Sequence, residues 1–301
     1  MSCESFPELS DTYSLLDSGE GARIEQWGEY ILQRPASLAI WSRCLSNKIS
    51  PHASYLPPGN WHGADRLPDQ WPTIVDGVTM LVRCQSNGQV GVFPEHSTYL
   101  DQIRRVSSRK GARVLNLFAY TGLASLAAAK SGAEVTHLDL SKGAIKWARE
   151  NAVENGISTI RFITDDAISF LEREVKRGNR YDLVIADPPS FSRPTAKAQW
   201  QLIEVVEQLI GAILRVVSPE GEVCMTSHSY ELGNVILRNL ISDKAEGPVD
   251  FLESRQLVIG EAQRNRRAPR GLPAGFLVWG CLGESIAERG VMPNGLRRVD
   301  G

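Results

Sequence analysis

The sequence lacks several features that would assign it to a class of protein directly. None of its 301 residues belong to an apolar run near the roughly 20 residues that a membrane-spanning helix needs. The first residues, MSCESFPELSDTY, lack the basic and apolar regions of a secretory leader. Neither sign of charge predominates, because 33 basic and 35 acidic residues give a formal net charge of −2. We therefore expect a cytoplasmic globular protein without a membrane segment or an overall basic surface.

Cysteine is scarce and is not arranged for cross-linking or for zinc. The five cysteines are Cys3, Cys44, Cys84, Cys224 and Cys281. Their number is odd, no C-x-x-C pair occurs, and no histidine lies nearby at the spacing of metal ligands. We expect free thiols in a reducing compartment, and neither a structural zinc nor another metal.

The chain also lacks the glycine-rich turn of dinucleotide-binding proteins. The segment VLNLFAYTGLAS (114–125) contains only Gly122, with Phe118 and Tyr120 where a pyrophosphate would require small residues. A ligand with an amino acid end and a nucleoside end tolerates this turn, since its carboxylate can bind free N–H groups near Thr121 and Gly122. S-adenosylmethionine is a ligand of that kind.

The N-terminal part of the chain has a β-type pattern. Short alternating segments over residues 13–35 predict hairpins, whereas residues 50–75 are rich in proline and glycine and predict mostly loop. The segment TIVDGVTMLVRCQSNGQVGVF (73–93) predicts two strands joined by a turn at SNG. We expect a small β-rich region over residues 1–95.

From residue 96 onwards, predicted strands alternate with predicted helices. This alternation over residues 96–284 indicates an α/β, Rossmann-like sheet that is mostly parallel and has helices on both faces. The segments 251–261 and 275–282 predict an antiparallel hairpin at one edge of that sheet. Residues 285–301 show no sustained periodicity and predict a loose tail.

Acidic residues follow two of the predicted strands, at the edge of the sheet where ligands bind. Asp139 can accept hydrogen bonds from both ribose hydroxyls; a capping role is less favoured because Ser141 already provides a helix N-cap. Asp166 can accept from an adenine amino group. It is equally typical of an acidic residue in the first turn of a helix.

The fourth strand of this region ends in the unusual segment VIADPPSF (184–191). Asp187 follows a buried strand, and Pro188 and Pro189 end the ladder because they lack N–H groups. An aspartate beside rigid carbonyls can hold an amino group or a ring N–H. Phe191 can stack on a planar base, which is worth roughly 1–3 kcal/mol. The segment therefore predicts an acceptor site.

The series VLNLFAYTG, LDLS, DDA and DPPSF resembles class I S-adenosylmethionine-dependent methyltransferases, in the group that contains the bacterial large-subunit rRNA cytosine-C5 methyltransferase. The resemblance covers residues 80–283. It implies a seven-stranded sheet with one antiparallel strand, and S-adenosylmethionine as cofactor. The residues that it implies at the cofactor are Asn116, Phe118, Tyr120 and Gly122 at the methionine end, Asp139 at the ribose, Asp166 at the adenine, Phe93 and Glu95 at the border, and Asp187 beside the methyl group. Core packing is an equal alternative for Phe93.

The chain departs from the cytosine-C5 enzymes at the position of their nucleophile. Methylation of C5 needs a cysteine thiolate that attacks the ring and makes the carbon nucleophilic, yet the segments MTSHS (225–229) and DPPSF contain no cysteine. His228 stands where the resemblance would put the thiol, and Cys224 is expected to be a buried apolar residue. We also expect the chain to lack the RNA-binding PUA domain of that enzyme. These departures favour a nitrogen acceptor.

One basic segment, QRNRRAPRG (263–271), provides a candidate contact with RNA. Its arginines are Arg264, Arg266, Arg267 and Arg270; a solvated hairpin loop is the alternative. The sequence thus predicts a methyltransferase that acts on a base in RNA, with rRNA favoured. Its catalytic residues would be Asp187, Pro188, Phe191 and His228. The alternatives are methylation of a protein side chain or small molecule, and a non-catalytic scaffold that binds cofactor or RNA.

Overall fold

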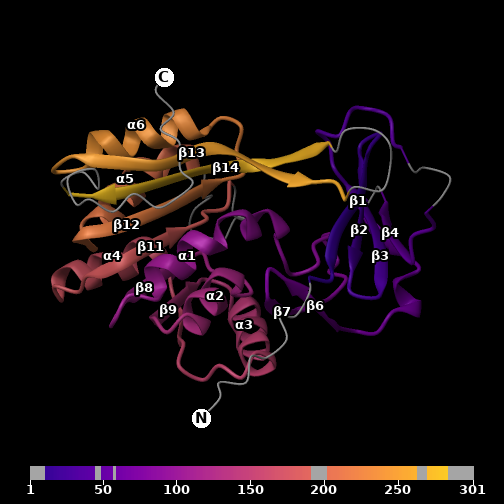
Figure 1. Cartoon of the computed structure of the whole chain (residues 1–301), viewed down its shortest axis with the longest axis horizontal. Helices are drawn as coiled ribbons and strands as arrows, with labels where there is room; N and C mark the ends of the chain where they lie inside the picture. The colour runs from indigo at the N-terminus through magenta and orange to yellow at the C-terminus, as the bar shows by residue number, and fades with distance from the viewer. Residues whose placement is uncertain (1–10, 45–48, 57–58, 191–201, 263–269, 284–301) are drawn as a thin grey trace, which may run out of the picture.

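The structure is a computed structural model that describes residues 11–44, 49–56, 59–190, 202–262 and 270–283. A small N-terminal sheet lies at one end of the molecule and a larger sheet with helices on both faces lies at the other (Figure 1). A two-stranded sheet lies between them. This arrangement agrees with the predicted α/β fold and the β-rich N-terminal region.

The N-terminal sheet has the strand order β1-β2-β3-β4-β5. Its elements are β1 (Tyr13–Gly19), β2 (Ala22–Trp27), β3 (Tyr30–Pro35), β4 (Ala53–Leu56) and β5 (Asn60–His62), followed by the short helix η1 (Ala64–Arg66). The hairpins expected over residues 13–35 are confirmed. The expectation of loop after residue 50 was wrong in part, because β4 and β5 pair despite their flanking prolines and glycines.

The expectation of two strands on either side of SNG was wrong, because a hairpin forms over residues 71–82 instead. Strands β6 (Trp71–Val75) and β7 (Val78–Val82) meet at Asp76 and Gly77, whose φ angles are 48° and 71°. Two successive positive φ angles are typical of the Asp-Gly turn, whose twist matches that of paired strands. The SNG segment makes a separate turn, closed by the Gln85 N–H donating to the Gln89 carbonyl at 3.0 Å.

The large sheet has the order β10-β9-β8-β11-β12-β14-β13. In chain order its elements are η2 (Pro94–Tyr99), α1 (Leu100–Ser107), β8 (Arg113–Leu117), α2 (Leu123–Lys130), β9 (Glu134–Asp139), α3 (Lys142–Glu154), β10 (Arg161–Thr164), α4 (Ala167–Lys176), β11 (Tyr181–Ala186), α5 (Leu202–Leu214), β12 (Val217–Ser227), α6 (Asn234–Lys244), β13 (Val249–Gly260) and β14 (Gly271–Leu282). The strand β14 is antiparallel to both of its neighbours, and the β13–β14 hairpin forms one edge, as predicted. None of the described helices is long and apolar enough to cross a membrane.

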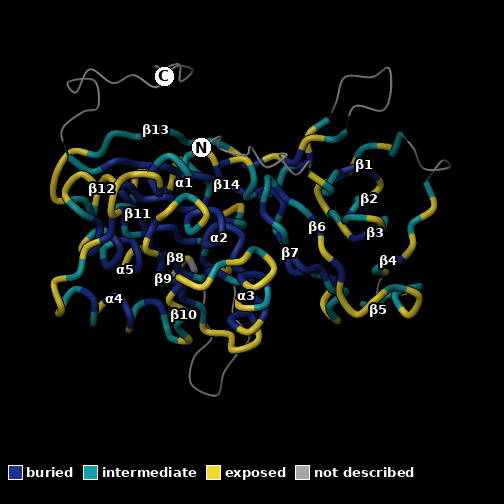
Figure 2. The backbone as a smooth tube through the Cα atoms, turned by 60° about the horizontal axis from the view of Figure 1, so that its bottom comes forward, coloured by how far each residue is buried: buried dark blue, intermediate teal, exposed yellow. Residues whose placement is uncertain are grey.

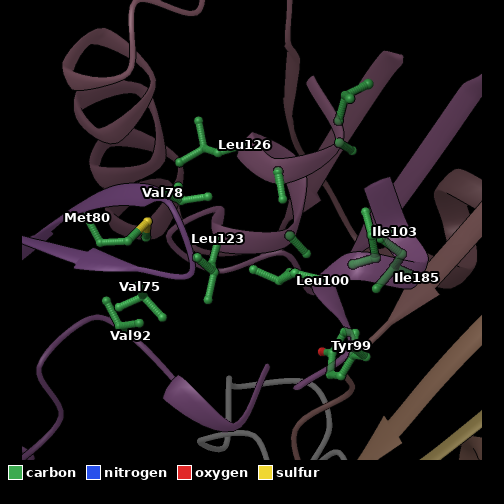
Figure 3. Close-up of a cluster of buried hydrophobic side chains, with 14 of the residues drawn as sticks. Val75, Val78, Met80, Val92, Tyr99, Leu100, Ile103, Leu123, Leu126 and Ile185 are labelled. Atoms are coloured by element: carbon green, nitrogen blue, oxygen red, sulfur yellow. The ribbon is translucent and has the colours of Figure 1, made fainter. Parts of the chain in front are cut away.

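Each central strand is covered on both faces, which explains its continuous apolar sequence. Along β11, Leu183 and Ile185 pack into one buried cluster whereas Val184 and Ala186 pack into another. Helices α1 and α2 contribute to the first cluster, part of which is shown in Figure 3, and α4, α5 and α6 to the second. Figure 2 shows the resulting buried centre beneath an exposed rim.

The β13–β14 hairpin extends beyond the large sheet and reaches the N-terminal sheet (Figure 1). Near its tip, Arg270 makes ion pairs with Asp17 at 2.9 Å and with Glu261 at 3.0 Å. The Ala262 N–H donates to the Leu15 carbonyl at 2.8 Å. The hairpin therefore joins the two ends of the molecule.

A buried carboxylate on β12 fixes α1 against the large sheet. Glu222 on β12 is fully buried. Its Oε2 atom lies 2.5 Å from the Arg105 guanidinium, and its Oε1 atom lies 2.5 Å from the Arg109 guanidinium. The indole N–H of Trp279 donates to the same carboxylate at 2.7 Å. A buried charge with three donors is stable only while its partners remain.

We predict that Glu222→Gln lowers the free energy of unfolding by about 3–5 kcal/mol, the usual cost of breaking a buried ion pair. The measurement is urea unfolding followed by circular dichroism. Glu220→Gln, at an exposed position of the same strand, is the matched control and should change stability far less. Equal effects of the two substitutions would contradict the assigned role of Glu222.

Candidate active site

The turn after β8 has a strained backbone at the carboxyl edge of the sheet. Phe118 and Tyr120 have φ angles of 54° and 49°, and Gly122 has a φ of 100°. Residues other than glycine rarely adopt positive φ angles. Such a backbone conformation persists only where the surrounding structure enforces it. Here the Asp139 carboxylate accepts from the Tyr120 N–H at 2.9 Å and from the Ser141 N–H at 2.8 Å.

Helix α2 starts directly after this turn without a capping side chain. The Gly122 N–H donates to the Ala119 carbonyl at 3.0 Å, so it is not free, contrary to the expectation from the sequence. The first N–H groups inside a helix have no intrahelical acceptor, and Leu123 and Ala124 line the adjacent pocket. The helix start therefore offers donors to a carboxylate one or two residues later than predicted.

A partly open pocket lies beside this turn. Its lining residues are Val92, Phe93, His96, Tyr99, Asn116, Phe118, Ala119, Tyr120, Thr121, Gly122, Leu123, Ala124, Ile185 and Asp187. Six of the predicted site residues meet here: Phe93, Asn116, Phe118, Tyr120, Gly122 and Asp187. The structure therefore gathers residues that lie far apart in the sequence.

A chain of buried polar groups forms the floor of the pocket. The Asn116 amide donates to Ser125 Oγ at 2.9 Å, and Ser125 Oγ lies 2.9 Å from His137 Nδ1. Burial disfavours the imidazolium and lowers the pKa of His137 to about 3, so its ring is neutral at neutral pH. The neutral ring can accept from the serine, which fixes the orientation of Asn116.

The wall opposite the sheet is anchored to β7. The Asn151 side chain accepts from the Leu81 N–H at 2.8 Å and donates to the Thr121 carbonyl at 2.9 Å. The Thr121 hydroxyl donates to the Gly91 carbonyl. Gly91 has a φ of 95°, and a Cβ there would lie 2.2 Å from the Trp147 ring, so only glycine fits. These contacts fix the position of Thr121, which lines the pocket.

Asp187 lies at the carboxyl end of β11 between two histidines. His96 Nε2 is 3.2 Å from Asp187 Oδ2, and His228 Nε2 is 3.3 Å from Asp187 Oδ1. The Thr226 hydroxyl donates to Asp187 Oδ1 at 2.5 Å. The ring of Phe93 lies within 6 Å, centroid to centroid, of both imidazoles, at 5.8 and 5.6 Å. The carboxylate is thus enclosed by rings.

The charges in this cluster support one another. Burial alone would lower the pKa of His228, but the charge of Asp187 and their contact outweigh it and raise the pKa to about 10. Burial would raise the pKa of Asp187, yet His228 and His96 hold that pKa well below its usual range. At neutral pH, His228 is therefore an imidazolium beside an aspartate anion.

The remaining predicted residues border the pocket or lie elsewhere. Glu95 is buried, with Oε1 3.8 Å from His228 Nδ1, and Pro188 is buried next to Asp187. Asp166 is the N-cap of α4, because its carboxylate accepts from the Ser169 N–H at 2.8 Å; its adenine role stays a prediction. Phe191 lies outside the described residues.

The basic segment is described only at its end. Arg264, Arg266 and Arg267 lie outside the described residues. Arg270 forms ion pairs with Asp17 and Glu261, so its side chain links the β13–β14 hairpin to the N-terminal sheet. Any contact of this segment with phosphates therefore depends on its other arginines.

Sequence reasoning missed His96, Tyr99 and Thr226. His96 directly follows Glu95 in the predicted border segment, and Thr226 lies two residues before His228. His96 and Thr226 thus lie within two residues of predicted site residues, and this closeness in sequence is the signal that could have identified them. The prediction that Cys224 is a buried apolar residue is confirmed, because the side chain is fully buried. Burial also raises the pKa of its thiol well above the usual value.

Comparison with known proteins gives this geometry a context. Residues 34–249 match the family model described as S-adenosylmethionine-dependent methyltransferase. A solved structure described as the SAM-dependent methyltransferase from Agrobacterium tumefaciens is 34% identical, covers 90% of both chains and superposes with a TM-score of 0.83. Fold and sequence therefore agree over most of the chain.

Curated relatives are similar over shorter stretches. Ribosomal RNA large subunit methyltransferase K/L of Shewanella frigidimarina is 37% identical over 123 residues, which are 40% of this chain and 17% of that protein. Ribosomal RNA large subunit methyltransferase K of Neisseria meningitidis serogroup B is 24% identical over 79% of this chain and 70% of that protein. The chain thus spans a small part of the first relative and about two thirds of the second.

We predict that Asp139→Ala weakens binding of S-adenosylmethionine about tenfold or more, since hydrogen bonds to a charged group contribute about 1.5–3 kcal/mol. The measurement is isothermal titration calorimetry. Asp182→Ala is the matched control, because Asp182 also accepts from a backbone N–H, that of Arg113 at 2.8 Å, but at the opposite edge of the sheet. Unchanged affinity of Asp139→Ala would refute the ribose role.

We predict that His137 remains neutral in the folded protein down to about pH 4, as histidine NMR would show. The unfolded chain takes up this proton near pH 6.5. Stability is therefore greatest above pH 6.5 and is lost as the pH falls toward 3. Between pH 7 and pH 5 this one group should reduce the free energy of unfolding by about 2 kcal/mol, a loss absent from His137→Asn. A His137 ring that titrates near pH 6.5 would contradict the prediction.

Proposed function

The chain belongs to the family of S-adenosylmethionine-dependent methyltransferases, and on that premise we propose that it methylates a nitrogen atom of a base in RNA, with rRNA as the favoured substrate. The observation that carries this proposal is the ionised Asp187 at the end of β11, enclosed by rings and without a reactive thiol among the described pocket residues. Such a site is suited to hold a planar, hydrogen-bonding acceptor.

The pocket fits the cofactor of the family in its donors and acceptors. The uncapped start of α2 suits the carboxylate of the methionine end, and Asn116 and Tyr120 lie beside it. The two hydrogen bonds that Asp139 already accepts leave carboxylate lone pairs for ribose hydroxyls. S-adenosylmethionine supplies the methyl group as a sulfonium substituent.

The acceptor would lie between Asp187 and the aromatic rings. The Asp187 carboxylate and the neighbouring proline carbonyl can accept from an amino group or ring N–H, which orients the acceptor atom. Phe93 offers an aromatic ring from the pocket side. We propose that Phe191 adds a stacking surface, as the sequence suggests.

The charge state of the site bears on which nitrogen is methylated. His228 already carries a proton at neutral pH, so it serves as the cationic partner of Asp187 and not as a base. Asp187 is a weak base because its pKa is depressed. An acceptor nitrogen with an available lone pair needs no prior loss of a proton. The site is therefore best suited to such a nitrogen.

Attack from a pyrimidine carbon would instead require a thiolate. Cys224 lies within β12, fully buried, and its raised pKa keeps it a thiol. Burial also raises the pKa of Cys84, to about 11. Neither cysteine lines the described pocket, which supports a nitrogen acceptor over cytosine C5.

The proposal of RNA as substrate rests on the relatives. The curated proteins from Shewanella frigidimarina and Neisseria meningitidis are both named as methyltransferases of large-subunit ribosomal RNA. Their names state the class of substrate but do not state which atom is methylated. With rRNA as substrate, we also propose a cytoplasmic location and contact of Arg264, Arg266 and Arg267 with phosphates.

We predict that the purified protein transfers a labelled methyl group to large-subunit rRNA from cells that lack it. Nucleoside mass spectrometry should detect an N-methylated base in the product and no 5-methylcytidine. Cys224→Ala should retain this activity within about threefold, although removal of a buried side chain costs about 1 kcal/mol of stability. Asp182→Asn, remote from the pocket, provides the matched control.

Two outcomes would refute parts of this proposal. If the protein formed 5-methylcytidine and Cys224→Ala did not, cytosine C5 would be the methylated atom. Failure to modify any RNA, with methylation of a protein or a small planar amine instead, would exclude RNA but leave the family membership intact. Binding of S-adenosylmethionine without any transfer would indicate a scaffold.

A further inference from the structure

Three ligand-type side chains converge at the acceptor end of the pocket, from separate elements. His96 comes from η2, Asp187 follows β11 and His228 follows β12. Their Nε2, carboxylate and Nε2 atoms all lie within 4.8 Å of one another. The side chains are 13%, 15% and 29% exposed, so the cluster is mostly shielded from water yet open on one side.

The contacts in this cluster are short, but neither has the alignment of a good hydrogen bond. Both Nε2 atoms are buried and lack an aligned acceptor among the described residues, although each lies 3.2–3.3 Å from a carboxylate oxygen. On an imidazole, a ring N–H and a ring lone pair point in the same direction. Both nitrogens are therefore directed past the oxygens, as they would be if an ion completed the cluster.

Groups around the cluster fix its orientation in the manner of a metal site. His228 Nδ1 is 2.8 Å from the Ala274 carbonyl, which can only accept, so Nδ1 carries the hydrogen and Nε2 is available as a ligand. The Thr226 hydroxyl donates to Asp187 Oδ1 and orients the carboxylate. Gly275 permits this packing, because a Cβ there would lie 2.8 Å from the Ser227 carbonyl oxygen.

We propose that His96, Asp187 and His228 form a binding site for a divalent transition-metal ion. Ligands at about 2.0–2.2 Å from one ion and at angles of 90–110° are about 2.9–3.5 Å apart, which includes both observed N···O distances. At the same angles the two nitrogens would be about 2.8–3.5 Å apart, and because they lie within 4.8 Å of one another here, binding of an ion would draw the histidines together by at most about 2 Å.

The ligand set selects the class of ion. Two imidazoles and one carboxylate suit Zn²⁺, Fe²⁺, Co²⁺ or Ni²⁺, whereas Mg²⁺ and Ca²⁺ prefer oxygen ligands. Three protein ligands leave positions open for a nitrogen or oxygen of the acceptor. The negative charge of Asp187 would attract a cation, and an imidazole binds a metal ion in its neutral form.

The proposed site departs from the expectation, drawn from the sequence, that the chain holds no metal. That expectation rested on the scattered cysteines, and none of them belongs to this cluster. The histidines and the aspartate are widely separated in the sequence, so no local spacing predicted the group. The proposal does not depend on which molecule accepts the methyl group.

The test titrates Co²⁺, and separately Zn²⁺, into the chelator-treated full chain without S-adenosylmethionine. We expect one equivalent to bind, with visible d–d absorption for Co²⁺ and heat for Zn²⁺. His96→Gln and His228→Gln should each weaken binding at least about tenfold. His62→Gln, at an exposed position on β5, is the matched control and should bind as the unsubstituted chain does.

Circular dichroism of each variant verifies that it is folded. Absence of binding to the unsubstituted chain overturns the proposal, as does binding that neither His96→Gln nor His228→Gln weakens. Because the readout is binding of the metal alone, either result leaves the methyltransferase assignment untouched.

Discussion

The hydrogen bonds that Asp139 accepts are the constraint on which the pocket depends. The chain must leave β8 and enter α2 within a few residues, and it does so with three positive φ angles. The carboxylate at the end of β9 holds that turn by the Tyr120 N–H. A neighbouring strand thereby fixes the strained backbone, which places the start of α2 and the side chain of Tyr120 around one cavity.

The second determinant is the balance of charge around Asp187. An isolated carboxylate at this depth would take up a proton, but His96 and His228 keep it ionised. The same pairing removes His228 as a base. The site thus combines a permanent acceptor of hydrogen bonds with little capacity to abstract a proton, which limits the chemistry to acceptors that are already nucleophilic.

Much of this site could be predicted from the sequence, because parallel strands bring their carboxyl ends to one edge. Asp139 and Asp187 were placed correctly at the tips of their strands on that argument. His96 was not, since its approach to Asp187 depends on how η2 packs against the sheet, which no local pattern encodes. The Asp76–Gly77 turn was not predicted although Asp-Gly is a strong hairpin signal, because Asn87-Gly88 is a second such signal nearby and the local pattern alone does not distinguish them.

The clamp at Arg270 has a consequence for the order in which the chain folds. Asp17 and Leu15 lie near the beginning of the described chain, but their partners Arg270 and Ala262 lie near its end. The N-terminal sheet emerges from the ribosome early, yet it cannot reach its final position until the β13–β14 hairpin has been synthesised. Contacts of such long range form slowly, so we expect the docking of the N-terminal sheet to be a late step of folding.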